Sequence, residues 1–276
     1  MPSNGELNAL IRLLDDENPD VRGPVESRLV SLGPDLSHQL AESSLELSAP
    51  MRSRLTKQLR PAPRERLRSE WLAPAGGATA MIDDWDQLEA MLRWISDFLH
   101  DGISVRLPLS DALDRLAQEA DSNGATNSRE LRGYLFVDDR LVANRTGFDQ
   151  PENSDLAWCL EHACSNQIGL SLIYILVARR LEMLVEGVDF PGHFLTRIYE
   201  EGYPLIIDCF EKGSLHLQST LLENPDLSRE QRASAQATAT TGAIICRVLR
   251  NLKLAMQKSD RLDDAQLVDE LLDSLI

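Results

Sequence analysis

The sequence has few aromatic residues and a deficit of basic ones. Of 276 residues, 5% are aromatic, 28 are Lys or Arg and 44 are Asp or Glu, which gives a formal net charge of −16. A core must therefore be built mainly from Leu, Ile, Val and Ala. The acidic balance argues against nucleic acid or an anionic membrane as the partner, because phosphate binding needs clustered Lys and Arg.

Long apolar runs and targeting signals are also lacking. The most apolar run, residues 168–178, is too short to span a bilayer, and residues 1–6 have neither a basic nor an apolar signal region. A cytoplasmic protein with reduced thiols is expected, so the four cysteines should be free. The sequence contains no phosphate-binding glycine loop and no dinucleotide fingerprint, and no cofactor is predicted.

The charge is unevenly distributed along the chain. Residues 1–80 carry 10 basic and 11 acidic side chains, whereas residues 81–276 carry 18 and 33. A ligand of the second part is therefore expected to be neutral or basic rather than phosphate-bearing. Residues 52–68 hold seven basic side chains against Glu65 alone. This strip is interpreted as a solvated face plus a linker rather than a basic contact patch, because no aromatic residue interleaves with the charges.

Helical and strand-like patterns divide the chain into four parts. Residues 1–60 have helical stripes, and their Leu-Leu-Asp-Asp-Glu-Asn-Pro-Asp-Val-Arg phrase at 13–22 resembles a HEAT-type helical hairpin. Residues 61–80 are rich in Pro, Gly and Ala and predict a linker. Residues 81–225 are expected to form the main domain. Residues 226–276 read as a helical extension.

The main domain is expected to combine helices with a small antiparallel sheet. Residues 168–184 are apolar almost all round, as a helix buried at the centre of a domain must be. Two strand-like runs follow, with a turn at 200–202 between them. The first covers 185–190 and continues into 193–199, and the second covers 204–210. Since helices precede and follow these strands, the predicted fold class is α+β.

Three side chains of this region have the types needed for thiol chemistry. Cys164 precedes the buried helix, where a helix N-terminus favours the thiolate; His193 can act as a base, and Asp208 can orient the imidazole. A two-residue turn at Glu200-Glu201 would place His193 directly opposite Asp208. A turn at Glu201-Gly202 would make them diagonal neighbours, and both registers put the two side chains on one sheet face. A turn centred on Glu201 would instead put them on opposite faces.

Several segments resemble the SirB-type transglutaminase-like proteins of bacteria. These are Val-Glu-Gly-Val-Asp-Phe-Pro-Gly-His-Phe-Leu-Thr-Arg at 185–197, Leu-Ser-Leu-Ile-Tyr-Ile-Leu-Val-Ala-Arg-Arg-Leu at 170–181, Ile-Asp-Cys-Phe at 207–210, residues 144–154, and Arg-Val-Leu-Arg-Asn-Leu-Lys at 247–253. The resemblance covers roughly residues 85–258. It implies a papain-related core with Cys, His and Asp, and a tetratricopeptide-like C-terminal extension.

The sequence departs from this family at the nucleophile. Family members with the nucleophile carry it directly before the helix, at the position of Gln167 here, whereas Cys164 comes three residues earlier. His193 and Asp208 match the other two positions. The resemblance therefore implies a degenerate site that binds a protein or peptide, with Asn166, Gln167 and Arg197 as binding residues. The alternative is a live thiol enzyme, a hydrolase or acyl transferase, that uses Cys164, His193 and Asp208.

The sequence does not predict a zinc site. Four side chains have donor atoms of the kinds that bind zinc: Cys159, His162, Cys164 and, as a fourth ligand, His193. Their spacing does not match the usual paired zinc ligands. The oligomeric state is left open by the sequence.

Overall fold

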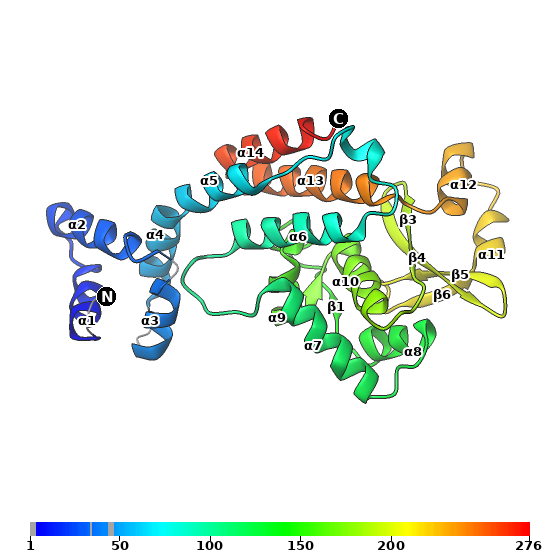
Figure 1. The fold of residues 1–276 in the computed structure, drawn as a ribbon, viewed down its shortest axis with the longest axis horizontal. Helices are drawn as coiled ribbons and strands as arrows, with labels where there is room; N and C mark the ends of the chain where they lie inside the picture. The colour runs from blue at the N-terminus through cyan, green and yellow to red at the C-terminus, as the bar shows by residue number, and fades with distance from the viewer. Residues whose placement is uncertain (1–3, 34, 44–46) are drawn as a thin grey trace. The chain divides into compact units, whose positions relative to one another are not determined.

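The structure is a computed structural model that describes residues 4–33, 35–43 and 47–276. It divides into two compact units (Figure 1). The first contains residues 1–69 and 98–106, and the second contains residues 70–97 and 107–276. Residues 1–3, 34 and 44–46, which belong to the predicted HEAT-like segment 1–60, lie outside the described residues.

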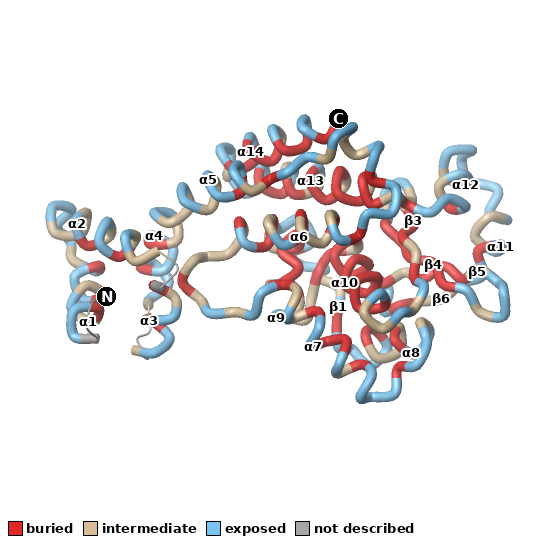
Figure 2. The backbone as a smooth tube through the Cα atoms, viewed as in Figure 1, coloured by how far each residue is buried: buried red, intermediate tan, exposed pale blue. Residues whose placement is uncertain are grey.

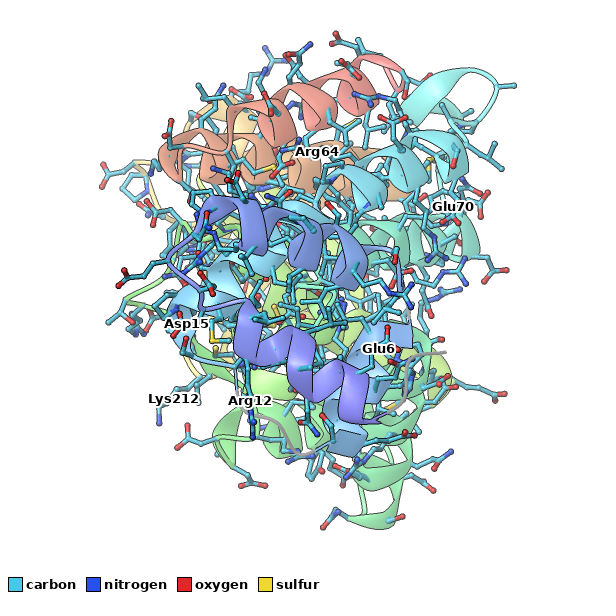
Figure 3. The ribbon with its side chains drawn as sticks, turned by 90° about the vertical axis from the view of Figure 1, so that its left-hand side faces the viewer. Glu6, Arg12, Asp15, Arg64, Glu70 and Lys212 are labelled. Carbon is cyan, nitrogen blue, oxygen red and sulfur yellow. The ribbon has the colours of Figure 1, made fainter. Side chains whose placement is uncertain are left out.

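The first unit is a set of short helices around a leucine-rich core. The helices are α1 (Asn4–Leu13), α2 (Pro19–Val30), α3 (Asp35–Ser43), α4 (Ala49–Leu59) and α5 (Pro61–Glu70). The first four of these helices contribute apolar side chains at helical spacing to this core, which includes Leu7, Leu29 and Leu55. Glu6 and Arg12 project from the exposed side of α1 (Figure 3), and Glu6 forms an ion pair of 3.1 Å with Arg28 of α2.

The local sequence explains where α2 and α4 begin. The Asn18 side chain accepts a hydrogen bond from the Asp20 backbone N–H, and Pro19 occupies the first helical position of α2. α4 begins after Ser48 and also has a proline in its first turn. Residues 61–80, expected to be a linker, contain α5 and the 3-10 helix η1 (Gly77–Ala80).

The second unit combines helices with a four-stranded antiparallel sheet, so the α+β prediction is confirmed. The strands β3 (Glu186–Phe190), β4 (His193–Glu200), β5 (Tyr203–Asp208) and β6 (Ser214–Leu217) lie in that order. Before them come α6 (Trp85–Leu99), α7 (Leu109–Ser122), α8 (Ser128–Arg132), a π-helical segment (Gly133–Val137), η3 (Pro151–Ser154) and α9 (Leu156–His162). β6 and the short parallel pair β1 (Val142–Ala143) and β2 (Cys164–Ser165) have no clear pattern in the sequence.

The centre of the second unit is α10 (Gln167–Arg180). Its residues 168–178 are all buried, as Figure 2 shows, in agreement with their all-round apolar sequence. The helix packs against β4, where the Ser171 hydroxyl donates a hydrogen bond of 3.4 Å to the Phe194 carbonyl. This contact brings the N-terminal end of α10 to the start of β4.

The C-terminal helices pack onto the same unit. α11 (Gln218–Leu222) and α12 (Arg229–Gln236) follow the sheet, and α13 (Thr241–Lys258) and α14 (Leu262–Asp273) lie side by side. Arg247 of α13 pairs with Asp189 of β3 and donates a hydrogen bond of 3.0 Å to the Phe190 carbonyl. Within the described residues, none of the helices has both the length and the apolar character needed to span a membrane.

Candidate functional site

Gln167 is positioned by a tightly built loop at the start of α10. Asn166 is the N-cap residue, and its Oδ1 accepts a hydrogen bond of 3.0 Å from the Gly169 N–H. Gly169 has no space for a side chain, because a Cβ there would lie 2.0 Å from the Oγ of Ser165. The Ser165 hydroxyl is itself held by a 3.1 Å hydrogen bond to the Asn153 carbonyl. Gln167 is thereby fixed as the first residue of the helix.

The β4–β5 hairpin places His193 and Asp208 on one face of the sheet. Glu200 pairs with Tyr203, so the turn is Glu201-Gly202, and both turn residues have the positive φ that such a turn needs. The structure therefore has the second of the two predicted registers. In it Asp208 is the diagonal neighbour of His193.

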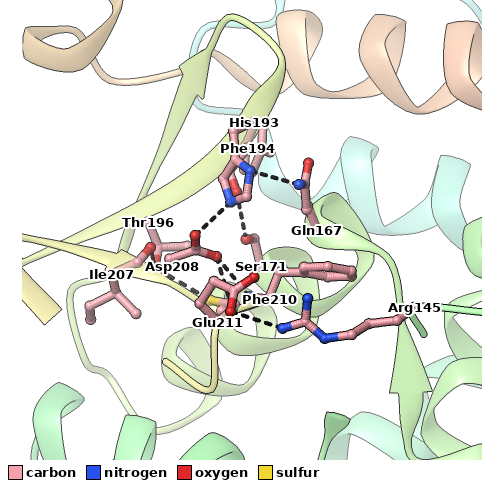
Figure 4. Close-up of polar contacts among 11 residues, drawn as sticks. Arg145, Gln167, Ser171, His193, Phe194, Thr196, Ile207, Asp208, Phe210 and Glu211 are labelled. Atoms are coloured by element: carbon pink, nitrogen blue, oxygen red, sulfur yellow. Dashed lines mark hydrogen bonds and ion pairs between the residues drawn. The ribbon is translucent and has the colours of Figure 1, made fainter. Parts of the chain in front are cut away.

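His193 lies between Gln167 and Asp208 (Figure 4). Its Nδ1 is 2.6 Å from the Gln167 Nε2, and its Nε2 is at an ion-pair distance of 2.8 Å from the Asp208 Oδ2. A carboxylate only accepts hydrogen bonds, so neutral His193 carries its ring proton on Nε2. Nδ1 is then an acceptor, and the Gln167 amide donates to it.

The surroundings of Asp208 favour its ionised form. Burial raises the pKa of this carboxyl, but contacts with His193 and two backbone hydrogen bonds outweigh burial and lower the pKa overall. The backbone N–H groups of Phe210 and Glu211 donate to Oδ1 at 2.9 and 3.1 Å. The carboxylate is thus held in place on both of its oxygens, which fixes its orientation toward the imidazole.

Cys164 does not take the place of a nucleophile at the helix end. It lies on β2, paired with Val142 of β1, and precedes the N-cap residue Asn166 by two positions. Burial raises the pKa of its thiol, the opposite of what a reactive thiolate needs. The His193 ring nitrogen that a thiol would use is occupied by Gln167.

The other three cysteines are buried in the core. Burial raises the pKa of Cys209 to about 12, and it also raises the pKa values of Cys159 and Cys246. The Cys159 thiol donates to the Ser165 Oγ at 3.1 Å, while His162 stacks on Trp158. Among the described residues, no group of three or more His, Cys, Asp or Glu side chains is arranged to hold a metal ion.

The two remaining expected binding residues have structural partners. Asn166 is buried and caps α10. Arg197 is also buried: its guanidinium contacts Glu186 at 2.6 Å, the Thr238 hydroxyl at 2.6 Å and the Gln236 carbonyl at 3.0 Å. Arg197 therefore joins β4 to β3 and to the segment before α13.

One group beside the site was missed by sequence reasoning. Arg145 donates a hydrogen bond of 2.8 Å to the carboxylate of Glu211, and its guanidinium lies 5.0 Å from the centre of the Phe210 ring. Both partners also donate backbone hydrogen bonds to Asp208. No local pattern could have found this group, because Arg145 lies more than 60 residues before its partners.

Comparison with known proteins places this site in a family. The sequence profile of the Transglutaminase-like superfamily matches residues 105–250, a range that contains Gln167, His193 and Asp208. UPF0162 proteins of two Xylella fastidiosa strains, Temecula1 and 9a5c, are each 37% identical over 139 residues, which is 48% of this chain and 50% of the relative. A UPF0162 protein of Pseudomonas aeruginosa is 30% identical over 165 residues, 57% of this chain and 58% of the relative. The chain thus spans about half the length of the curated relatives it matches. No solved structure gives a significant match.

Proposed function

We propose that this chain, which belongs to the Transglutaminase-like superfamily, is a SirB-type cytoplasmic protein that binds a protein or peptide at a degenerate active site. The observation that carries the proposal is the 2.6 Å contact between the Gln167 Nε2 and the His193 Nδ1. A carboxamide cannot act as a nucleophile. A thiol at this position would have needed the same ring nitrogen as its base.

The state of Cys164 supports the same proposal. Its pKa is raised by burial, and the backbone of β2 holds it before the helix rather than at its first position. Nucleophilic attack needs the thiolate and close contact with a base. The Gln167 carboxamide, with its oxygen and a second N–H, is suited to hydrogen bonding with a peptide, whereas both ring nitrogens of His193 already have partners.

We also propose that the helical ends contribute to partner binding. In this proposal residues 1–60 are a HEAT-like appendage, residues 61–80 join it to a domain at 81–225, and residues 226–276 are a tetratricopeptide-like extension. Helical hairpins of both kinds present faces to other chains. The separate core of the first unit supports treating the appendage as a part of its own.

Thiol reactivity tests the loss of the nucleophile. The wild-type protein and His193→Ala are treated with iodoacetamide near pH 6, and alkylation of each cysteine is followed by mass spectrometry. We expect slow alkylation of Cys164 that is the same in both proteins, because burial keeps its thiol protonated. Selective, fast alkylation of Cys164 that disappears in His193→Ala would instead support the alternative, a thiol hydrolase or acyl transferase.

Peptide selection tests the binding role. A displayed library of random heptapeptides is selected on the wild-type protein, and dissociation constants of the selected peptides are measured. A Gln167→Trp variant, which fills the space beside His193, should bind them roughly 10-fold more weakly or worse. Gln266→Trp is the matched control, since Gln266 is an exposed glutamine of α14. Equal binding by all three proteins, or no selected peptides, would contradict the proposal.

A further inference from the structure

A cavity of about 410 Å³ lies beside the His193–Asp208 pair and has no assigned role. Both residues of the pair line it, while Gln167 does not. Its volume is within the range of about 300–1,000 Å³ that is usual for ligand pockets. The cavity is therefore a separate space that shares only the imidazole and the carboxylate with the degenerate site.

The floor of this cavity is apolar because of the sheet register. Val188 pairs with Leu195, and Arg197 pairs with Ile206, so these side chains lie on the same sheet face as His193. Val188, Leu195 and Ile206 form a buried cluster against which Phe190 and Leu221 pack. The four of these residues that line the cavity, Phe190, Leu195, Ile206 and Leu221, offer an apolar side chain a dry surface.

The cavity contains no free charge for an ionic ligand. Its one carboxylate, Asp208, is bound on both oxygens by His193 and by two backbone N–H groups. Residues 81–276 carry 33 acidic and 18 basic side chains, so an anion meets repulsion over the whole domain. The acidic surroundings thus disfavour an anion, and the apolar lining disfavours a cation, because an unpaired charge is costly to bury. The part of a ligand that enters the cavity is therefore expected to be uncharged.

The rim of the cavity is polar and lies at an edge of the sheet. Four residues contribute polar groups to it: Ser214, His216, Thr220 and Asn224. β6, which carries the first two, is the last strand in the order β3-β4-β5-β6 of the described sheet. An edge strand offers backbone N–H and C=O groups to an extended peptide, whose alternate side chains then point to one sheet face.

From these observations we infer that the cavity binds one apolar side chain of an uncharged, extended peptide segment. The floor takes the side chain, and the rim with the edge of β6 binds the neighbouring peptide groups. This inference rests on the proposed peptide-binding function and names the ligand class for it. A peptide is favoured over a free apolar molecule because the polar groups are gathered beside β6, the last strand in the order of the described sheet.

Two neighbouring residues of α11 allow a matched test. Thr220 lines the cavity and Ser219 does not, although both are exposed. Thr220→Trp is expected to fill the mouth of the cavity, and Ser219→Trp adds the same side chain outside it. Peptides selected from the random heptapeptide library on the wild-type protein are the probe. Circular dichroism melting shows that each variant is folded.

We expect the selected peptides to share one apolar position. Alanine at that position should weaken binding roughly 10- to 100-fold, the effect of losing one buried apolar side chain. Thr220→Trp should weaken binding roughly 10-fold or more, while Ser219→Trp should stay within about twofold of the wild type.

Three other results would overturn the inference. In the first, Thr220→Trp binds the peptides as well as the wild type does, while Gln167→Trp loses binding. The cavity is then not the binding site, but the proposed peptide-binding function still holds. In the second, the selected peptides share acidic or phosphorylated residues instead of an apolar residue. This result contradicts the proposed ligand class, an uncharged segment with one apolar side chain. A wild-type protein that selects no peptide at all contradicts both the inference and the proposed function.

Discussion

The Gln167 amide donates a hydrogen bond to the Nδ1 of His193 over 2.6 Å, at the first position of the buried helix α10. On the opposite side of the ring, Asp208 faces Nε2 at 2.8 Å. The imidazole is therefore oriented as a general base would be, but its acceptor nitrogen faces a carboxamide instead of a thiol.

Replacing this amide by a thiol is predicted to create a reactive cysteine. In Gln167→Cys the new thiol lies at a helix N-terminus beside an oriented imidazole, and both features lower a thiol pKa. We expect iodoacetamide near pH 6 to alkylate it roughly 10- to 30-fold faster than Cys164, given the partial loss of nucleophilicity at lower pKa. Mass spectrometry of each cysteine measures this rate.

The controls for this thiol are double variants. Gln167→Cys combined with His193→Ala should return the rate to that of an ordinary cysteine, and combination with Asp208→Asn should give an intermediate rate. If the thiol of Gln167→Cys reacts no faster than Cys164, His193 does not activate a thiol at position 167, and the prediction is wrong.

Acid is predicted to remove a stabilising contribution of Asp208. The pKa of this carboxyl is lowered in the fold, so its contribution is present above the unfolded value of about 3.9 and is lost as pH falls through the folded pKa. Asp208→Asn should therefore lower the free energy of unfolding by about 1–2 kcal/mol at pH 7. At pH 3 the difference between the two proteins should be smaller.

Tryptophan fluorescence during urea unfolding suits this measurement. All four tryptophans, Trp71, Trp85, Trp94 and Trp158, belong to the second unit, so the signal reports that unit. Asp139→Asn is the control, because Asp139 forms an exposed ion pair with Lys212 and its loss should cost about 0.5 kcal/mol or less. A difference that grows on acidification would contradict the pKa direction.

Loss of Arg197 is predicted to destabilise the second unit strongly. Its guanidinium is 5% exposed and contacts the Glu186 carboxylate and two further oxygen atoms. Arg197→Ala leaves these groups without their partner, and we expect a loss of about 3 kcal/mol in urea unfolding. Arg129→Ala, which removes an exposed pair with Glu200, should leave the unfolding curve nearly unchanged. If Arg197→Ala lowers the free energy of unfolding only slightly, Arg197 is not needed for stability, which would favour the alternative that it binds a ligand.

A methyl group at Gly169 is predicted to disturb the loop that positions Gln167. The added Cβ would lie 2.0 Å from the Ser165 Oγ, which is buried and hydrogen bonded. Gly169→Ala should therefore cost about 1–3 kcal/mol in urea unfolding. Gly133→Ala is the matched control, because a Cβ there meets nothing within 4 Å and its φ is not positive. Equal stability of the two variants would show that the loop adjusts freely.

The β4–β5 hairpin shows how much of a strand register the local sequence can predict. The strand runs and the polar turn allowed a turn at Glu200-Glu201, at Glu201-Gly202 or centred on Glu201. Only the first two put His193 and Asp208 on one face, because side chains alternate along a strand. The sequence could not choose between them. The structure selects the Glu201-Gly202 turn, in which Gly202 takes a φ of +84° without strain.

The place of Cys164 shows where local reasoning ends. A thiol three residues before the helix was close enough in sequence to be considered for the nucleophile. Its position depends on the pairing of β2 with β1, which lies more than 20 residues away, and on the cap at Asn166. The same limit hid the Arg145–Glu211 pair, which forms only when distant segments meet.

The sequence by itself determined the fold class, the buried helix and the two adjacent strands that carry His193 and Asp208. These follow from apolar periodicity and strand alternation, which act between near neighbours in the chain. Only the tertiary structure decided which side chain faces Nδ1 of His193, that Arg197 is buried in an ion pair, and that a cavity opens beside Asp208. Those outcomes depend on the packing of α10, α11 and the segment before α13 against the sheet. Such packing joins residues that are far apart in the chain, so no local sequence pattern predicts it.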